Sequence, residues 1–340
     1  MKIINKYIIN KVTKYCDLDK INKSILSSND IVDINTMGNI EKLELIVNVE
    51  IINNIRRINK FHEEVNEILV KDGIYVSCLE TLEERKKRVK KKAIIGFKKI
   101  FLFLDFIYKR VIPKLPIVKT IYFAITNGHN RVLSKAESLG RLISCGFQIL
   151  EYFEFENILY VISKKSKSPE FDMNPSYGPL FKMKRIGKNG KIIGVYKIRT
   201  MHPYSEYCQD LITKENKLAE SGKIAHDFRI TYWGKIFRKY WIDELPMIIN
   251  FLKGEITLVG VRPLSVSYFS RYPNDLQKLR IQIKPGLIPP YYADMPKNFE
   301  EILLSERKYI NQKLKYPITT DIAYFFKVFF NIFFKGARSK

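Results

Sequence analysis

Two adjacent carboxylates stand near the head of a short helix-like run in this 340-residue chain. They are Asp243 and Glu244, in the stretch WIDELPMIINFLKGEITLVGVRP. Pro246 is typical of the first turn of a helix, and Gly254 is typical of the position just past its end. The partial positive charge of a helix N-terminus favours ionised carboxylates, and a carboxylate nucleophile must be ionised. The pair therefore predicts a site that could attack an electrophile and hold a metal ion.

An arginine follows this predicted helix closely. Strand-like residues 255–260 lead to Arg262 and Pro263, and the helix and strand are each only roughly 12–20 Å long. The chain can therefore bring Arg262 back toward the two acids. Because a guanidinium matches phosphate oxygens with its planar fork, acids and arginines together predict a phosphoryl-transfer site. The alternative is an ordinary helix cap that faces a surface arginine.

Other polar and glycine-containing blocks surround the acids in a fixed order. Each block alone is a weak signal, but their order and spacing together are specific. The blocks are Gly178-Pro179 with Arg185, Gly187 and Gly190; Tyr196-Lys197-Ile198-Arg199-Thr200-Met201; Arg229 with Thr231, Gly234 and Arg238; Asp243-Glu244-Leu245-Pro246 with Asn250 and Gly254; Gly260-Val261-Arg262-Pro263; and Lys284-Pro285-Gly286. On these motifs, residues 177–290 resemble the bacterial sugar transferase family, monotopic phosphoglycosyl transferases that act on polyprenol phosphates.

The resemblance implies transfer of a sugar-1-phosphate from a nucleotide diphosphate sugar, with a UDP-sugar as the expected donor, to undecaprenyl phosphate. Asp243 would attack the sugar-proximal phosphorus, and the lipid phosphate would then take the phosphosugar from the enzyme. Glu244, with Asp243, would hold Mg²⁺. The product would initiate a surface glycan such as capsule, exopolysaccharide or O-antigen. The residues expected to bind substrate are Arg262, Arg238, Arg199, Lys197, Pro263 and Lys284.

The chain departs from the family pattern in two places. The family usually has a membrane-dipping helix directly before the Gly-Pro opening, where this chain has residues 158–177, ILYVISKKSKSPEFDMNPSY, which cannot form such a helix. The nearest candidate for that helix is the proline-broken segment 94–116. After Lys284-Pro285-Gly286 the family usually continues with threonine or tryptophan, glycine and a glutamine, whereas this chain reads LIPPYYADMP. The second departure leaves the sugar and acceptor specificity open.

Two stretches before the motifs show the pattern of an α/β fold. Residues 43–52 and 71–80 are strand-like and flank a helical pattern, and residues 134–165 indicate a helix, a turn at Gly146 and two strands. These stretches resemble the back half of the nucleotide-dependent methyltransferase fold, without its glycine-rich cofactor turn. We therefore expect an α/β (α+β) chain: a degenerate Rossmann-like domain at 1–168 and a compact catalytic domain with amphipathic helices at 169–340.

The charge and apolar patterns predict a membrane partner. Lys and Arg number 59 against 35 Asp and Glu, for a net charge of +24, which suggests a polyanionic partner. A basic cluster at 85–92 precedes the apolar segment 94–116, and together they predict a membrane-associating segment near 85–125. No uninterrupted apolar run approaches the roughly 18–20 residues of a spanning helix. An ordinary core helix with a solvated basic face is the alternative.

The C-terminal stretch shows a second apolar pattern. Lys327, Asn331 and Lys335 share one narrow stripe of a helix that is otherwise rich in phenylalanine. This pattern favours a helix at the membrane interface, on the cytoplasmic face of the inner membrane, over burial between domains.

Two further functional classes are less consistent with the motifs. A nucleic-acid-binding protein would account for the basic charge, but no helix-turn-helix, zinc or RNA-binding signature occurs, so no nucleic-acid partner is expected. An idle scaffold of a glycan assembly system would not need the intact Asp243-Glu244 pair. The expected partners are a nucleotide sugar, a polyprenol phosphate and membrane lipids, and a homodimer is left open.

Overall fold

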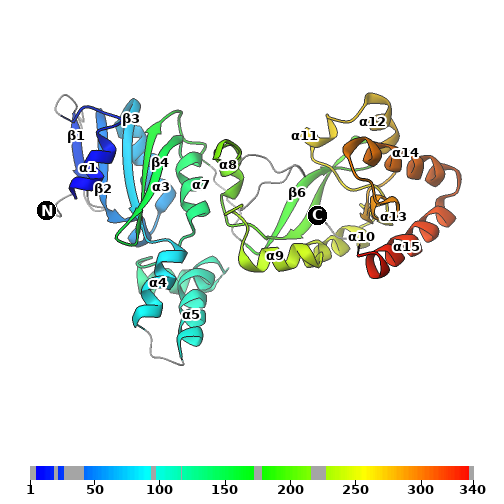
Figure 1. Ribbon diagram of the computed structural model, residues 1–340, viewed down its shortest axis with the longest axis horizontal. Helices are drawn as coiled ribbons and strands as arrows, with labels where there is room; N and C mark the ends of the chain where they lie inside the picture. The colour runs from blue at the N-terminus through cyan, green and yellow to red at the C-terminus, as the bar shows by residue number, and fades with distance from the viewer. Residues whose placement is uncertain are drawn as a thin grey trace. The chain divides into compact units, whose positions relative to one another are not determined.

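The computed structural model describes residues 5–18, 22–26, 42–92, 97–115, 117–171, 178–215 and 227–336. The chain separates into two compact units (Figure 1). Unit 1 comprises Met1–Tyr177 and Met201–Arg229, and unit 2 comprises Gly178–Thr200 and Ile230–Lys340. This division differs from the predicted one in that residues 201–229, from within the motif-bearing half, fold with unit 1.

Unit 1 is built on a five-stranded sheet in the order β1-β2-β3-β5-β4. The first three strands are parallel, and β5 is antiparallel to both of its neighbours. The strands predicted at 43–52 and 71–80 and the two predicted within 134–165 are confirmed. The strands are β1 (Lys23–Leu26), β2 (Leu43–Ile51), β3 (Leu69–Leu79), β4 (Phe147–Phe155) and β5 (Ile158–Lys165).

Helices pack on both faces of this sheet. Helices α3 (Ile58–Ile68) and α7 (Lys135–Ser144) share one apolar core with Tyr75 of β3. Helix α1 (Lys6–Val12) shares a second core with Val76, the next residue of β3. Successive side chains of a strand point to opposite faces, so the continuous apolar run of β3 serves both cores. The predicted helices in this region are confirmed.

Residues from the motif-bearing half complete the core of unit 1. The turn η5 (Ser205–Cys208) and helix α8 (Gln209–Glu215) bring Cys208 and Ile212 into the α3–α7 core, where both are fully buried. Tyr204 lies against α7 so closely that a Cβ at Gly140 would be 2.1 Å from the Tyr204 carbonyl oxygen. Only glycine fits such an approach, so this position ties α7 to the 201–229 segment.

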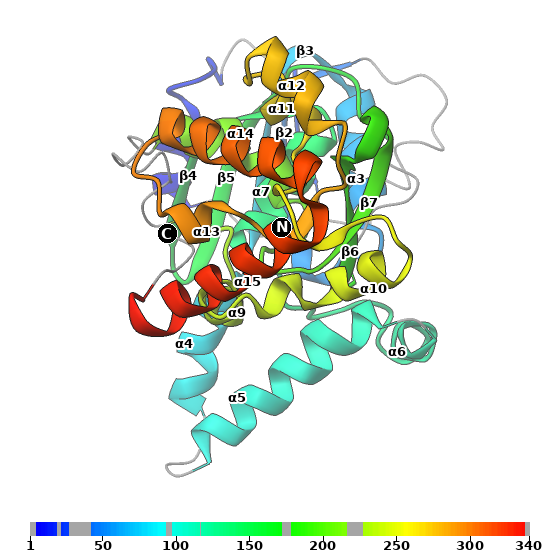
Figure 2. The same ribbon diagram turned by 90° about the vertical axis from the view of Figure 1, so that its right-hand side faces the viewer.

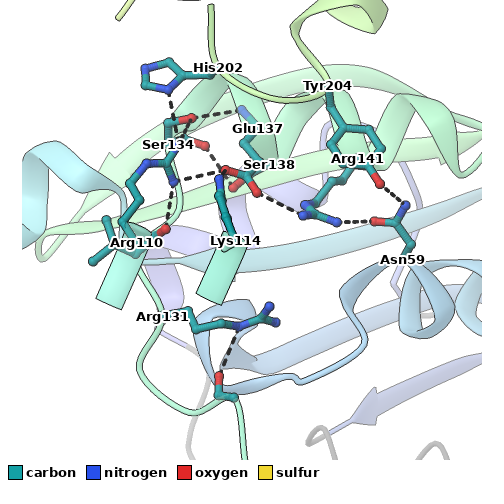
Figure 3. Close-up of polar contacts among 12 residues, drawn as sticks. Asn59, Arg110, Lys114, Arg131, Ser134, Glu137, Ser138, Arg141, His202 and Tyr204 are labelled. Atoms are coloured by element: carbon teal, nitrogen blue, oxygen red, sulfur yellow. Dashed lines mark hydrogen bonds and ion pairs between the residues drawn. The ribbon is translucent and has the colours of Figure 1, made fainter. Parts of the chain in front are cut away.

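A buried ion cluster lies beside the same helix (Figure 3). Glu137 on α7 pairs with Arg110 and Lys114 at 3.0 Å each and with Arg141 at 2.9 Å. Burial opposes ionisation of Glu137, but the three cations outweigh it and hold the pKa of Glu137 well below its ordinary value. Arg110 also donates to Nδ1 of His202 at 3.1 Å. The cluster therefore anchors both the segment around Arg110 and the start of the 201–229 segment to α7.

The segment that Arg110 anchors carries a solvent-exposed apolar surface. It comprises α5 (Lys98–Phe106), the π turn η2 (Ile107–Val111), η3 (Ile112–Lys114) and α6 (Val118–Thr126), and the basic helix α4 (Leu82–Lys92) precedes it. No residue of α5 is buried, so the interpretation as an ordinary core helix is wrong. Residues 93–96 and 116 of the predicted segment lie outside the described residues. Its exposed apolar side chains include Phe97, Ile100, Phe101, Phe103, Leu104, Ile117, Ile121 and Ile125.

Unit 2 contains two short strand pairs. Strands β6 (Leu180–Ile186) and β7 (Ile192–Ile198) form a hairpin, whose turn places Asn189 and Gly190 at positive φ. Strands β8 (Thr257–Val259) and β9 (Gly286–Ile288) pair in parallel. A Cβ at Gly286 would lie 2.1 Å from the backbone nitrogen of Gly260. The glycines of two sequence motifs thus permit the close approach of β8 and β9.

Helices make up the rest of unit 2 (Figure 2). No described helix in either unit is both long and apolar enough to span a bilayer. The helices are α9 (Tyr232–Lys239), α10 (Ile248–Leu252), α11 (Val266–Phe269), α12 (Asn274–Arg280), α13 (Tyr291–Asp294), α14 (Phe299–Lys315) and α15 (Pro317–Phe334).

The polar stripe of the C-terminal helix α15 faces helix α13. Asn331 is buried and donates to the backbone carbonyl oxygens of Tyr292 and Ala293 at 3.0 and 2.8 Å. Lys327, one turn earlier on the same stripe, pairs with Asp294 at 2.9 Å. Asn331 therefore lies on the protein-facing side of α15, where its amide satisfies buried carbonyl groups.

We expect Gly140→Ala to destabilise unit 1, because the added methyl group would overlap the Tyr204 carbonyl oxygen. The loss should be about 1–3 kcal/mol, as for other overpacked sites, measured by urea unfolding. Gly194→Ala is the matched control, because its Cβ would meet only the Lys182 side chain at 3.4 Å. Equal stability of the two variants would contradict the close contact between α7 and Tyr204.

Candidate active site

An asparagine holds the acid-bearing turn against strand β7. Asn250 of α10 is fully buried. Its Oδ1 accepts from the Tyr196 backbone N–H at 2.9 Å, and its Nδ2 donates to the Gly194 carbonyl oxygen at 2.8 Å. These two bonds replace the hydrogen bonds that a neighbouring strand would make to β7. They fix α10, and the turn that precedes it, beside the Lys197 end of β7.

The two acids lie in the first turn of a 3₁₀ segment, η6 (Ile242–Met247). The prediction that Pro246 opens an α-helix is wrong: Pro246 lies inside η6, and α10 begins at Ile248. Gly254 follows the end of α10 at φ 67°, as predicted. Since α10 begins after both acids, nearby cations are the main electrostatic partners of the acids.

Glu244 is the centre of a small charge network. Its Oε1 accepts from Lys197 Nζ at 2.5 Å and from Arg262 Nη2 at 3.2 Å. Arg262 Nη1 donates to the Tyr291 hydroxyl at 3.2 Å. Burial lowers the pKa of Lys197, and Glu244 opposes this shift. The predicted return of Arg262 toward the acids is confirmed.

Asp243 is the more deeply buried acid, with 9% of its surface exposed. Burial raises its pKa above the ordinary value of 3.8. The charge of Lys197 lowers the pKa, Glu244 raises it, and Arg238 lowers it. Arg238 is itself held by Thr200, whose Oγ1 accepts from Arg238 Nε at 2.9 Å. Two cations thus favour the ionised form of Asp243 against its burial.

A cavity of about 370 Å³ opens beside Glu244. Four of the predicted site residues line it: Glu244, Lys197, Arg262 and Pro263. Its remaining lining includes the polar or aromatic side chains of Arg185, Ser265, Tyr268, Tyr272, Tyr291 and Glu306. Positive charge at one wall and aromatic rings around it form a site with the features of a binding pocket for a phosphorylated organic molecule.

Three predicted substrate ligands, Arg238, Arg199 and Lys284, lie outside that lining, as does Asp243. Arg199 donates from Nε to the Gly178 carbonyl oxygen at 3.0 Å and lies over the Phe181 ring. Lys284 is exposed, with its ammonium group beside Gly254. Their roles as substrate ligands stay predictions.

The parallel strands of unit 2 bring together residues that the sequence separates. Arg262 follows β8 by three residues, and Tyr291 follows β9 by three residues. The carboxyl ends of parallel strands meet at one edge of a sheet, so the two side chains meet there. Arg280 Nη2 also donates to the Arg262 carbonyl oxygen at 2.6 Å, and Arg280 forms a buried ion pair with Glu306.

The sequence prediction missed Tyr291, Arg280 and Glu306. The signal for Tyr291 was the pair of tyrosines in the segment that follows the Lys-Pro-Gly block and departs from the family pattern. Arg280 and Glu306 carried no such signal.

The carboxylates suit a hard divalent cation. Mg²⁺ is usually bound through one or two carboxylates together with substrate phosphates. Asp243 and Glu244 can supply those carboxylates. Among the described residues, no group of three or more His, Cys, Asp or Glu side chains converges at this site or at any other, so further ligands would have to come from the substrate. The donor set therefore fits a cation that arrives with a diphosphate ligand.

Residues 172–335 match the model of the bacterial sugar transferase family, which confirms the predicted resemblance for this part of the chain. A galactosyl transferase from Streptococcus agalactiae is 39% identical over 140 residues, which cover 40% of this chain and 31% of the relative. A UDP-glucose:undecaprenyl-phosphate glucose-1-phosphate transferase from Klebsiella pneumoniae is 30% identical over 217 residues, covering 63% of this chain and 42% of the relative.

An undecaprenyl-phosphate galactose phosphotransferase from Salmonella typhimurium is 34% identical over 116 residues, covering 32% of this chain and 24% of the relative. The chain therefore spans less than half of the length of each of these three relatives.

We expect Asp243→Asn to stabilise the protein at neutral pH by about 0.5–2 kcal/mol, the usual range for stabilising substitutions. Because the pKa of Asp243 is raised, its contribution to stability is present below the ordinary aspartate pKa. That contribution is lost as the pH rises through the raised value. The neutral amide of asparagine does not undergo this loss. The melting temperature of Asp243→Asn should therefore exceed that of wild type at pH 7, and the two melting temperatures should converge in acid.

Asp275→Asn is the control for this stability effect. Arg307 lowers the pKa of Asp275, so its replacement should act in the opposite direction or not at all. A melting temperature of Asp243→Asn below that of wild type at pH 7 would contradict a raised pKa.

Proposed function

We propose that residues 172–335 transfer a sugar-1-phosphate from a UDP-sugar to undecaprenyl phosphate and so initiate a surface glycan such as capsule, exopolysaccharide or O-antigen. One observation supports this most directly: Glu244, beside Asp243, is held between Lys197 and Arg262 at the wall of a cavity. Acids and phosphate-binding cations thus share one site in the region that matches the sugar transferase family.

The proposed reaction has two displacement steps at one phosphorus atom. In the first, a carboxylate oxygen of Asp243 forms a bond to the phosphorus nearer the sugar. The bond from that phosphorus to the bridging oxygen breaks, and UMP leaves with the electron pair. In the second, an oxygen of undecaprenyl phosphate attacks the same phosphorus and the aspartyl bond breaks. Asp243 is thereby restored, and the sugar is left on an undecaprenyl diphosphate.

The cations around the acids have distinct roles in this proposal. Arg262 is the best-placed ligand of the donor diphosphate, because its guanidinium lines the cavity and keeps 43% of its side-chain surface exposed. Lys197 and Arg238 keep Asp243 ionised. Mg²⁺ held by Glu244 and Asp243 would neutralise charge on the diphosphate.

The acceptor is a lipid, and unit 2 has an exposed apolar surface at the acid-bearing turn. Helices α9, α10 and α15 run along the same edge of unit 2 in both views (Figures 1 and 2). We call this the α9–α10–α15 surface. Its large exposed apolar residues are Tyr232, Ile236 and Tyr240; Leu245, Ile248 and Leu252; and Phe326, Phe329, Phe330, Phe333 and Phe334. Its extent supports contact with the interface of a bilayer.

The exposed apolar segment of unit 1 supports a second membrane contact. The helix α4 that precedes it carries Lys86, Lys87, Lys90 and Lys91, which are exposed. Lysines beside exposed apolar rings favour an anionic cytoplasmic leaflet, so we place the chain on the cytoplasmic face of the inner membrane. A homodimer stays a prediction.

Unit 1 itself is proposed to be a degenerate methyltransferase-like domain. Three parallel strands followed by an antiparallel pair, with helices on both faces, support this assignment. The chain offers no glycine-rich turn for a nucleotide cofactor there, so we assign unit 1 no catalysis.

The proposed function predicts UMP release. Protein in membranes should release UMP from at least one of a panel of UDP-sugars, and the radiolabelled sugar should appear in undecaprenyl diphosphate. Asp243→Asn keeps the side-chain shape but removes the attacking charge, so turnover should fall at least ~10³-fold, a barrier rise of about 4 kcal/mol. Asp275→Asn is the exposed control. Near-normal turnover of Asp243→Asn would contradict the covalent path.

The membrane proposal predicts that Phe329→Glu with Phe333→Glu moves part of the protein from the membrane to the soluble fraction. Burial of each phenylalanine in the bilayer interface contributes roughly 1.5–3 kcal/mol to membrane binding. The exposed apolar segment of unit 1 should keep the rest of the protein in the membrane fraction. Vesicle co-sedimentation and thermal melting measure the two effects separately. Leu304→Glu on α14 is the control, because Leu304 and Phe333 are 65% and 67% exposed. A double variant that melts early yet stays wholly with vesicles would contradict the proposal.

A further inference from the structure

The segment that departs from the family pattern forms part of the site. Its paired residues Tyr291 and Tyr292 open helix α13 and reach two different parts of the site. We propose that Tyr291 positions Arg262 for the donor diphosphate, and that Tyr292 positions the acid-bearing turn through Trp241. The inference rests on the proposed function and assigns each tyrosine a separate kinetic effect.

Tyr291 contacts the guanidinium that is best placed to bind phosphate. Its hydroxyl oxygen accepts from Arg262 Nη1 at 3.2 Å, while Arg262 Nη2 donates to Glu244 at 3.2 Å. Burial raises the pKa of the Tyr291 hydroxyl, which therefore stays neutral at physiological pH. Because Nη1 and Nη2 of Arg262 both donate to fixed acceptors, the orientation of the guanidinium plane is set before a ligand binds. Tyr291 also lines the cavity itself.

Tyr292 contacts the residue that precedes the acid-bearing turn. Trp241 Nε1 donates to the Tyr292 hydroxyl at 3.0 Å, and the two rings meet edge to face at 5.6 Å. The backbone of Trp241 is left-handed, at φ 56° and ψ 16°. For a bulky side chain this conformation is strained, and it persists only where surrounding contacts hold it. The Trp241 carbonyl oxygen accepts from the Glu244 N–H at 3.0 Å, so its conformation sets the geometry of the turn.

The two tyrosines are held by rigid surroundings. Pro289 and Pro290 precede them and fix two successive φ angles. Asn331 of α15 donates to the carbonyl oxygens of Tyr292 and Ala293. The tyrosine rings lie 4.5 Å apart, centroid to centroid. Such a segment can act as a fixed support, because its backbone groups and both hydroxyls already have partners.

Different kinetic effects follow from the two contacts. Loss of the Tyr291 hydroxyl loosens Arg262, which would contact the diphosphate of the UDP-sugar both before and during the reaction. The loss should therefore raise KM for the UDP-sugar and leave kcat near wild type. Loss of the Tyr292 hydroxyl releases the strained turn that carries the nucleophile, so it should lower kcat and leave KM near wild type. The two single-atom deletions are therefore controls for each other.

The experiment compares Tyr291→Phe and Tyr292→Phe in vesicles of defined lipid with undecaprenyl phosphate and the UDP-sugar that wild type accepts. We expect Tyr291→Phe to raise KM by about tenfold, equivalent to ~1.4 kcal/mol. Calorimetry in the Asp243→Asn background should show UDP binding weakened by a similar factor, since UDP carries the diphosphate without the sugar. We expect Tyr292→Phe to lower kcat by about tenfold with UDP binding unchanged.

Two double-mutant cycles separate positioning from general loss of stability. The effect of Tyr291→Phe should largely disappear in an Arg262→Lys background, where the fork is already lost. The effect of Tyr292→Phe should largely disappear in a Trp241→Asn background, where the indole N–H that donates to Tyr292 is absent. Asparagine is the replacement because it tolerates the left-handed conformation at this position. Additive effects in a cycle would overturn that half of the inference.

The failure of this inference can be distinguished from failure of the proposed function. An active wild type whose tyrosine variants show the same KM, kcat and UDP affinity as wild type would overturn the inference alone. Variants that lower kcat and raise KM together, in parallel with melting temperature, would assign the tyrosines a structural role only. A wild type that releases UMP from no donor would overturn the proposed function and the inference with it.

Discussion

The carboxylate of Glu244 is the point at which three separate parts of unit 2 meet. Lys197 reaches it from the end of β7, Arg262 from the loop after β8, and Glu244 itself comes from η6. Glu244 is partly buried, and a charge withdrawn from water is costly unless it is paired, so removal of one partner leaves the others less well compensated. The pairing therefore constrains the positions of the end of β7, the loop after β8 and η6 relative to one another. The cavity, with Arg262 and Lys197 in its wall, is a consequence of that constraint.

The neighbouring Asp243 shows why this arrangement must be strained. Burial raises its pKa, whereas a nucleophile has to be ionised. Lys197 and Arg238 provide the opposing charge, but they do not fully offset burial, so the native state is less stable with an ionised Asp243. A left-handed tryptophan stands two residues before the same acid. A strained backbone at Trp241 and an unfavourably buried charge at Asp243 thus lie in one turn, as is common at functional sites. Asn250 and the Tyr291–Tyr292 segment hold that turn in place.

The two units are interleaved along the chain. Residues 201–229 leave unit 2 directly after Thr200, a residue that holds Arg238, and they complete the α3–α7 core of unit 1. His202 enters the ion cluster around Glu137 (Figure 3). Removal of the N-terminal part of unit 1, Met1–Tyr177, would therefore expose apolar side chains, such as Cys208 and Ile212, that belong to the motif-bearing half. The N-terminal part is consequently not an appendage that can be deleted without effect on that half.

The sequence by itself determined several elements and the residue types at the candidate site. Alternating and continuous apolar runs predicted β2, β3 and the β4–β5 pair, and the Lys188–Gly190 turn is typical of a hairpin such as β6–β7, because these signals are local. Motif order identified the Asp243–Glu244 pair and predicted that Arg262 would approach it. Only the tertiary structure decided which residues complete the site. Tyr291, Arg280 and Glu306 come from segments after β8 and α11, and they reach Arg262 through strand pairing and helix packing. The protein-facing position of Asn331 and the assignment of 201–229 to unit 1 likewise depend on long-range packing, which leaves no periodic signal in the chain.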